Sequence, residues 1–391
     1  MSKKIGLMLI GMNGAIATTV TAGIEAIKKQ QIDEIGLITQ IDEFKKLNLV
    51  SIENLQIGGW DIVESPHIDC MRNHHIVDNE LIDKISDDLA KITVYKAPKV
   101  GITKHILNVD GIKNTECKTG VKEAIAKIID DINDFVSKNK LDGVVIGNLS
   151  STEPLPKETE FLQSIEAFEE AIESNNSNIK SGMIYAYAAI KAHAPYFNFT
   201  PSVTVGNPAL TQLALREHVA VAGNDGKTGQ TLYKTVIAPM LKWRNLKLEG
   251  WYSTNILGNN DGRVLEEPDH KETKIRSKSK VLSNILGYDD FYHRVEINYY
   301  PPRNDAKEAW DNIDFKGWLG KRMSMKINWI GEDSILAAPL VVDIARLLWY
   351  TQEREDYGVA KHLSSFFKDP INNNDHNFNN QIQLLLDYIY N

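Results

Sequence analysis

The feature that most constrains the fold is a repeated order of short apolar run and helical segment in the first part of the chain. Residues 4–11 (KIGLMLIG) suit a buried strand, and residues 14–27 have the apolar and small side chains of a helix packed on it. The order recurs at 121–149, where apolar residues at helical spacing precede the run LDGVVIGNL. We also expect a strand at 35–39 (IGLIT). Such alternation predicts a parallel sheet covered by helices on both faces.

The pattern changes after residue 245. Further helices are expected before this point at 156–174, 181–193, 207–218 and 229–243, with a strand at 219–223. Apolar and polar or aromatic residues then alternate in the segments 247–257, 291–302 and 321–330, which is typical of half-buried antiparallel strands. Helical patterns return at 334–350, 357–366 and 379–390. We therefore expect an α/β domain interrupted by an α+β insertion, with the C-terminal helices returning to the first domain.

Composition and charge argue against several classes of protein. The 391 residues carry a formal net charge of −8, which does not suit the broad basic face that nucleic acid or an anionic membrane requires. The N-terminal apolar run ends at Gly11, and no run approaches the roughly 20 apolar residues of a transmembrane helix. The two cysteines, Cys70 and Cys117, provide no disulfide framework, in keeping with a reducing compartment. We expect a cytoplasmic protein that binds neither nucleic acid nor membrane.

The turn between the first strand and the first helix, residues 11–19 (GMNGAIATT), has the position of a phosphate-binding turn. Glycines let the backbone approach a pyrophosphate, and the helix start offers unpaired N–H groups. Asn13 occupies the second glycine position of G-x-G-x-x-G, so the segment could bind a dinucleotide or be a plain tight turn. Gln40 stands where an acidic residue would hold a ribose at the end of the expected second strand, so that carboxylate must come from elsewhere.

A second turn, residues 222–231 (AGNDGKTGQT), ends one expected strand and begins a helix. The N–H groups at this helix start and the hydroxyls of Thr228 and Thr231 would form a cradle for an anion. The glycine spacing is not that of a Walker loop. The alternative is an N-capped helix with no ligand.

Lys274 and Lys278 are four residues apart and would share one face of a helix. Like charges at this spacing repel and invite an anion between them, although the same pair could form a solvated basic face. The preceding run 257–262 (LGNNDG) favours the anion, because its amides and carboxylate can bind sugar hydroxyls or a ribose.

A metal site is not expected at the histidines of the first domain. The spacing of His67, Cys70, His74 and His75 matches no zinc pattern, so we expect these histidines to be packed or on the surface. The sequence specifies no metal, and a role for a monovalent or divalent cation is left open.

Several segments together resemble one enzyme family, the myo-inositol-1-phosphate synthases. They are GMNGAIATT (11–19), GGWDI (58–62), NLSSTEP (148–154), AGNDGKTGQT (222–231), LGNNDG (257–262), KIRSKS (274–279) and GEDSILAAPLVVD (331–343). The compact length resembles the archaeal and bacterial members. The resemblance implies a Rossmann-type, doubly wound parallel sheet in an NAD-binding domain of residues 1–230 and 333–391. It implies a catalytic and tetramerisation domain, α+β with an antiparallel sheet, at 231–332.

The resemblance also implies the site residues. The NAD contacts would be Gly11, Asn13, Gly14, Ala17, Asp61, Asn148, Asp225 and Asp261, with Asp61 on the adenosine ribose. The substrate contacts would be Thr228, Gly229, Gln230, Thr231, Asn255, Asn259 and Lys278. The catalytic residues would be Lys274, Lys278, Lys307, Lys368, Asp261 and Asp333.

The implied reaction converts glucose 6-phosphate to an inositol phosphate by oxidation at C5, enolisation, attack of C6 on the C1 aldehyde, and reduction by the retained NADH. Ammonium groups stabilise the developing oxyanions in a dry site, and desolvated lysines can move protons. Lys274 and Lys307 would take oxyanion and proton-transfer roles, and Lys278 and Lys368 would contact the phosphate and ring oxygens. The implied assembly is a homotetramer.

Two alternatives compete with this reaction. An NAD-dependent oxidoreductase acting on another sugar or polyol phosphate would release NADH with its product. A non-catalytic protein that binds a nucleotide or a sugar phosphate would keep the fold, but the retained lysines argue against it.

Overall fold

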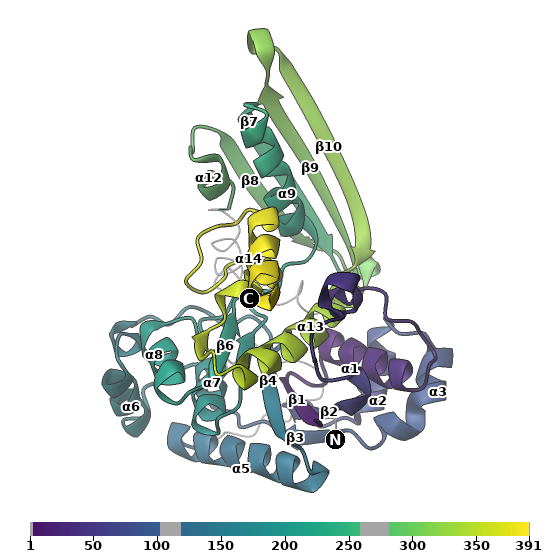
Figure 1. Ribbon diagram of the computed structural model, residues 1–391, viewed down its shortest axis with the longest axis vertical. Helices are drawn as coiled ribbons and strands as arrows, with labels where there is room; N and C mark the ends of the chain where they lie inside the picture. The colour runs from purple at the N-terminus through teal and green to yellow at the C-terminus, as the bar shows by residue number, and fades with distance from the viewer. Residues whose placement is uncertain (1–2, 102–118, 259–280, 391) are drawn as a thin grey trace.

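The computed structural model describes residues 3–101, 119–258 and 281–390, which form two sheets (Figure 1). The first sheet is parallel. Its described strands are β1 (Ile5–Ile10), β2 (Leu55–Asp61), β3 (Thr93–Lys96), β4 (Gly143–Asn148), β5 (Tyr196–Asn198), β6 (Ala220–Gly223) and β11 (Gly358–Val359). Read from one edge, the order is β3-β2-β1-β4-β5-β6-β11. This is the strand order of a doubly wound Rossmann sheet, and it confirms the predicted fold class.

Helices cover both faces of this sheet. Met8 and Ile10 of β1 pack in one core with α5 (Val121–Asn139), α6 (Ile165–Glu173), α7 (Ser181–Lys191) and α8 (Pro208–Arg216). Leu7 and Leu9 face the opposite core, which is formed with α1 (Ala15–Lys28), α13 (Asp333–Glu353), the 3-10 helix η7 (Lys361–Phe366) and α14 (Phe378–Tyr390). The C-terminal helices therefore return to the first sheet, as the sequence predicts.

The predicted strand at 35–39 is wrong. Ile35 is 87% exposed, and Gly36 has a φ of +100° that breaks an extended strand. The backbone N–H of Ile38 donates to Asp343 of α13 at 2.8 Å instead of to a neighbouring strand. The second strand is β2, and it lies beside β1 in parallel.

Two predicted helices are shorter than their apolar patterns. The helix expected at 156–174 begins at Ile165, where the Ser164 side chain accepts the N–H of Ala167 as an N-cap. The segment expected to be helical at 357–366 contains the short strand β11 followed by η7.

The second sheet has the order β10-β9-β7-β8 and projects away from the first (Figure 1). Its strands are β7 (Lys247–Leu257), β8 (Tyr292–Tyr299), β9 (Ala306–Lys316) and β10 (Arg322–Glu332). The sheet is mixed and not purely antiparallel, because β8 pairs with β7 in parallel. The chain between these two strands is long enough for the crossover that a parallel pair needs. Two helices, α9 (Gly229–Trp243) and α12 (Val281–Leu286), pack on the sheet through Leu241, Trp251 and Leu282.

One described helix, α13, is long and apolar enough to cross a membrane, with a mean hydropathy of 1.4 over 18 residues. A search for uninterrupted apolar runs misses the helix, because Asp343 and Arg346 lie within it. Of that window, 67% is buried in the fold, as in a core helix of a globular protein.

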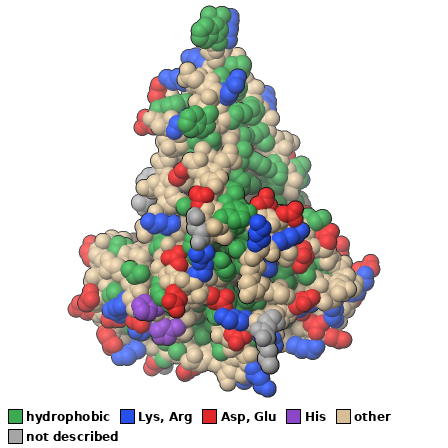
Figure 2. All heavy atoms as spheres, viewed as in Figure 1, with side chains coloured by type: hydrophobic (Ala, Val, Ile, Leu, Met, Phe, Trp, Pro, Cys, Tyr) green, Lys and Arg blue, Asp and Glu red, His purple; other side chains and the backbone are tan. Residues whose placement is uncertain are grey.

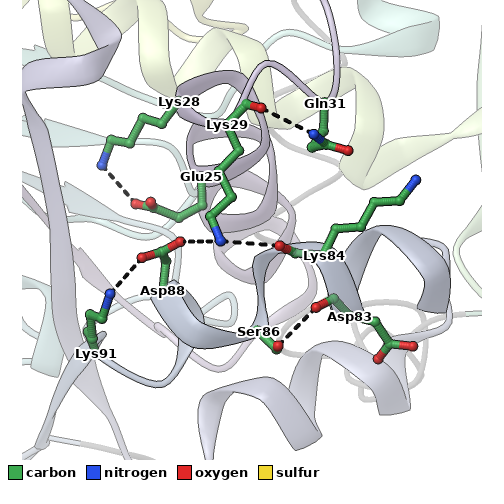
Figure 3. Close-up of polar contacts among 9 residues, drawn as sticks. All are labelled: Glu25, Lys28, Lys29, Gln31, Asp83, Lys84, Ser86, Asp88 and Lys91. Carbon is green, nitrogen blue, oxygen red and sulfur yellow. Dashed lines mark hydrogen bonds and ion pairs between the residues drawn. The ribbon is translucent and has the colours of Figure 1, made fainter.

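Helix α3 (Asn79–Leu89) is held against α1 by apolar contacts and by a group of surface charges (Figure 3). Asp88 accepts from Lys29 at 2.7 Å and from Lys91 at 2.8 Å, while Lys28 pairs with Glu25 on the same helix. Exposed ion pairs contribute about 0–1 kcal/mol each, so the apolar contacts dominate this interface.

We expect Gly59→Ala to destabilise the fold by at least about 3 kcal/mol, because an added Cβ overpacks the sheet at a backbone angle that disfavours side chains. The Cβ would lie 2.0 Å from the carbonyl oxygen of Leu9, and Gly59 has a φ of +154°. Urea unfolding followed by circular dichroism measures the change. Gly250→Ala is the control, since its Cβ would meet Tyr292 at an ordinary 3.7 Å. Equal effects of the two substitutions would contradict the close packing of β1 and β2.

Candidate active site

The turn after β1 lies at the carboxyl edge of the parallel sheet and is tightly held by both neighbouring strands. Gly11 has a φ of +86°, and its N–H donates to the carbonyl oxygen of Trp60 at 2.9 Å. A Cβ at Gly11 would lie 3.3 Å from the carbonyl oxygen of Leu149, which follows β4. A larger residue would therefore be strained at this position.

Asp61, the last residue of β2, lies directly beside this turn. Its Oδ2 accepts the backbone N–H of Asn13 at 2.7 Å, and its Oδ1 accepts that of Val63 at 2.8 Å. Burial raises the pKa of Asp61, and these hydrogen bonds oppose the shift. The structure thus brings Asp61 to the glycine turn, at the strand end where a ribose carboxylate is usually found.

The side chain of Asn13 is directed towards the loop after β2. Its Nδ2 donates to the carbonyl oxygens of Val63 at 3.1 Å and Ser65 at 3.2 Å, and its Oδ1 lies 3.0 Å from His67 Nδ1. His74 Nε2 lies 2.8 Å from the carbonyl oxygen of Asn13. These two histidines contact the turn, and the described residues contain no cluster of three or more histidines, cysteines or carboxylates that could hold a metal.

Helix α1 begins immediately after the turn without a side-chain cap. Its N-cap residue is Gly14, and its first turn contains no acidic residue. Ala17 is buried against the core beneath, so it can face a ligand only through its backbone. The unpaired N–H groups and the positive end of the helix dipole suit the pyrophosphate of a dinucleotide.

Asparagines at three neighbouring strand ends form a connected row. Asn148 Nδ2 donates to Asn198 Oδ1 at 3.2 Å, and Asn198 Nδ2 donates to Asn224 Oδ1 at 2.8 Å. Asn148 is among the cofactor contacts predicted from the sequence, and Asn198 is not. The missed signal is a repeated strand-Asn-x-Ser/Thr pattern, in which Asn148 accepts from Ser150 and Asn198 accepts from Thr200.

Glu153 lies buried near this row, at the start of α7. Its two carboxylate oxygens accept the backbone N–H of Gly182 at 3.3 Å and 3.2 Å. Burial raises the pKa of Glu153 to about 7, against the lowering effects of this hydrogen bond and of Lys180.

The start of α9 brings together three residues that the sequence analysis named. Thr228 is the N-cap residue, but its Oγ1 donates to Asp333 Oδ1 at 3.1 Å and does not cap the helix. Lys307 Nζ donates to the same oxygen at 3.4 Å. Gly229 and Thr231 complete a first turn without acidic residues. An uncapped helix start beside a hydroxyl and an ammonium group suits a phosphate.

Gln230, also in this first turn, joins α9 to the second sheet. Its Oε1 accepts from Asn255 Nδ2 at 2.8 Å, and its Nε2 donates to Asp311 Oδ2 at 2.9 Å. Gln230 and Asn255, both predicted substrate contacts, thus contact each other. Asp311 was not among the candidates, because it lies within a strand and belongs to no local motif.

The remaining described pair is Asp225 with Lys368. Lys368 Nζ donates to Asp225 Oδ1 at 2.7 Å, and both side chains are nearly fully buried. Lys368 comes from the chain after η7, so the C-terminal segment supplies a charge at the end of β6. Breaking a buried pair of this kind leaves an uncompensated charge.

Two buried lysines beside the site were not among the candidates. Burial lowers the pKa of Lys227 to about 7 and that of Lys234 to about 8. Lys227 Nζ donates to Gln381 of α14, and Lys234 Nζ lies 2.9 Å from His293 Nε2. The remaining predicted residues, Asn259, Asp261, Lys274 and Lys278, lie outside the described residues.

Comparisons with known proteins identify the family of this chain. The family model for myo-inositol-1-phosphate synthase matches residues 5–389. The chain belongs to this family. An inositol-3-phosphate synthase 1 from Bacteroides thetaiotaomicron is 36% identical over 95% of this chain and 91% of its own length.

Two solved structures resemble this chain in fold. The inositol-3-phosphate synthase of Caenorhabditis elegans matches with a TM-score of 0.89 and 26% identity, covering 100% of this chain and 86% of that one. A myo-inositol-1-phosphate synthase-related protein from Thermotoga maritima matches with a TM-score of 0.80 and 23% identity over 98% of both chains, which supports the fold alone.

Glu153 predicts a specific dependence of stability on pH. Its pKa is about 7 in the folded state and near 4.5 when unfolded, so the folded state binds the proton more tightly. Its contribution to the free energy of unfolding is therefore full below pH 4.5 and falls as the pH rises to 7, by on the order of 3 kcal/mol. We expect Glu153→Gln to lose less stability than wild type between pH 5 and pH 8 in thermal unfolding. If the stabilities of wild type and Glu153→Gln changed equally with pH, this role of Glu153 would be ruled out.

Proposed function

We propose that this chain is an NAD-dependent isomerase that converts D-glucose 6-phosphate to 1D-myo-inositol 3-phosphate. The observation that carries the proposal is the start of α9, where an uncapped helix end, the Thr228 hydroxyl and the Lys307 ammonium meet. The identity to the Bacteroides inositol-3-phosphate synthase supports the choice of substrate and product.

The cofactor fits the carboxyl edge of the parallel sheet. When bound, NAD would supply reversible hydride transfer, so that the reaction would have no net redox change. The N–H groups at the start of α1 would hold the pyrophosphate, and Asp61 would accept hydrogen bonds from the adenosine ribose. Asn148 and Asp225 would line the path from this end of the cofactor towards the substrate.

The substrate fits the start of α9. The N–H groups of the first turn and the hydroxyl of Thr231 would bind the phosphate and thereby orient the sugar, and the Thr228 hydroxyl would join them by turning from Asp333 to the phosphate. Lys307 Nζ, held by Asp333 Oδ1, would donate to a sugar oxygen that gains negative charge during the reaction. Lys368 Nζ, held by Asp225, would do the same at the end of β6. Lys274 and Lys278 would complete the set of ammonium groups.

The chain is proposed to work as a cytoplasmic homotetramer, with the insertion at 231–332 as the catalytic and assembly domain and 1–230 with 333–391 as the NAD-binding domain. Large apolar side chains on the second sheet and on the turn between β9 and β10 support such an assembly: Trp310 is 53% exposed, Trp318 88% and Ile330 59%. Figure 2 shows hydrophobic side chains gathered over the projecting sheet and down the middle of the same face.

The reaction is tested by its use of cofactor. With glucose 6-phosphate and a small amount of NAD, we expect many turnovers of product per NAD, and no accumulation of NADH absorbance. Phosphorus NMR identifies the inositol phosphate formed in the same tube. Release of one NADH per product would instead support an oxidoreductase acting on a sugar phosphate. Neither product nor NADH would support a non-catalytic binding protein.

We expect wild-type protein to prefer NAD over NADP, because the Asp61 carboxylate accepts ribose hydroxyls and repels a 2′-phosphate. Asp61→Asn should raise the Kd for NAD about tenfold, since one charge-assisted hydrogen bond is weakened. It should also reduce the preference for NAD over NADP. Calorimetric titration with both cofactors measures this. Asp42→Asn is the control, because Asp42 is exposed and pairs with Lys45 on the surface. Equal affinities of wild type for NAD and NADP would remove Asp61 from this role.

A further inference from the structure

Asp311 lies at the centre of a buried hydrogen-bond network between the second sheet and α9. It is on β9, and its side chain is 3% exposed. Its Oδ1 accepts from Trp251 Nε1 and from Ser253 Oγ, both at 2.6 Å and both on β7. Its Oδ2 accepts from Gln230 Nε2 at 2.9 Å. All three neighbours donate, which is what an ionised carboxylate requires.

A buried cation lies near this carboxylate. Lys234 is on α9, one turn after Gln230, and its ammonium lies 5.8 Å from the centre of the Trp251 ring. The negative charge of Asp311 raises the pKa of Lys234 and partly offsets the effect of burial.

The charge of Asp311 determines the direction of two amides. An ionised carboxylate can only accept, so Gln230 must turn its NH2 group towards Asp311 and its carbonyl oxygen towards Asn255. Asn255 must then donate, and its Nδ2 does so to Gln230 at 2.8 Å and to the carbonyl oxygen of Glu296 at 3.3 Å. The other polar atom of this amide, Asn255 Oδ1, is fully buried and has no hydrogen-bond partner among the described residues.

We propose that Asp311 is a positioning residue that directs these two amides, so that Asn255 Oδ1 accepts a hydrogen bond from a hydroxyl of the bound sugar phosphate. The inference rests on the proposed function and on the substrate contacts that the family resemblance implies for Gln230 and Asn255. Asp311 acts through Gln230 and does not touch the substrate. A buried carbonyl without a donor costs free energy, so a ligand hydroxyl that supplies the donor is favoured over a ligand without one.

Asp311→Asn keeps the shape of the side chain but adds a donor. The indole of Trp251 can only donate, so the new amide must keep its oxygen there and turn its NH2 group towards Gln230. Gln230 and Asn255 then reverse, and Asn255 presents NH2 to the substrate in place of oxygen. We expect kcat/KM for glucose 6-phosphate to fall about 10- to 100-fold, as for one misdirected hydrogen bond in a buried site.

Ser253→Ala is the matched control for this variant. It removes one donor to Asp311 but leaves the direction of both amides unchanged, so we expect kcat/KM within roughly threefold of wild type. Thermal unfolding of both variants separates loss of stability from loss of activity. If Asp311→Asn reduces activity no more than Ser253→Ala does, the positioning role is refuted.

A second substitution should restore the direction of the network. In the double variant Asp311→Asn with Gln230→Glu, the glutamate can only accept, from the new amide on one side and from Asn255 Nδ2 on the other. Gln230→Glu alone sets two carboxylates against each other. We expect the double variant to be more active than either single variant, whereas losses that simply multiply would overturn the proposal. If Asp311→Asn alone does not fold, the activity of the double variant is compared with that of Gln230→Glu alone. A double variant no more active than Gln230→Glu would then refute the proposal.

The same assays separate this inference from the proposed function. A wild-type protein that does not convert glucose 6-phosphate would refute the proposed function, and this inference with it. A wild-type protein that converts the substrate, together with equal effects of Asp311→Asn and Ser253→Ala, would refute only the role of Asp311.

Discussion

The shared carboxylate oxygen of Asp333 is the contact on which the arrangement of the site depends. It accepts from Thr228, which precedes α9, and from Lys307 on β9, while Asp333 itself begins α13. Asp305 holds the start of α13 in place, because its carboxylate accepts the N–H and hydroxyl of Ser334 in the first turn of that helix. Three elements from distant parts of the sequence thus meet at one point. The lysine is thereby held beside the helix start that would bind the phosphate.

Charged groups around this junction are buried, and the way each is compensated differs. Asp61 and Asp311 accept hydrogen bonds from fixed donors, and Asp225 is paired with Lys368. Burying a charge is costly unless such partners are in place. Lys227 and Lys234 are less fully compensated, and burial therefore shifts the pKa of each well below its ordinary value. The site thus combines rigidly held carboxylates with ammonium groups that hold their protons less tightly.

The sequence predicts local features of this site well and long-range ones poorly. The glycine turn and the start of α9 were found because strand, turn and helix follow one another within a few residues. The strand at 35–39 was wrong, because an apolar run does not reveal that Ile38 bonds to a helix 305 residues away in sequence. Asp61 was nevertheless named, through a motif and not through the expected strand. Asp311 makes its hydrogen bonds only when β7, β9 and α9 are adjacent, and no local sequence pattern predicts that adjacency.

The return of the C-terminal helices to the first sheet has a consequence for biosynthesis. Leu7 and Leu9 of β1 are covered on one side by α1 and also by α13, η7 and α14, which the ribosome makes long after β1. Until those residues leave the exit tunnel, this face of the N-terminal sheet is only partly covered, and α13 is the apolar helix that must pack on the rest. Contacts between such distant segments close slowly. The nascent chain is therefore most prone to aggregate, and most dependent on chaperones, during the interval between the synthesis of β1 and the arrival of α13 and α14.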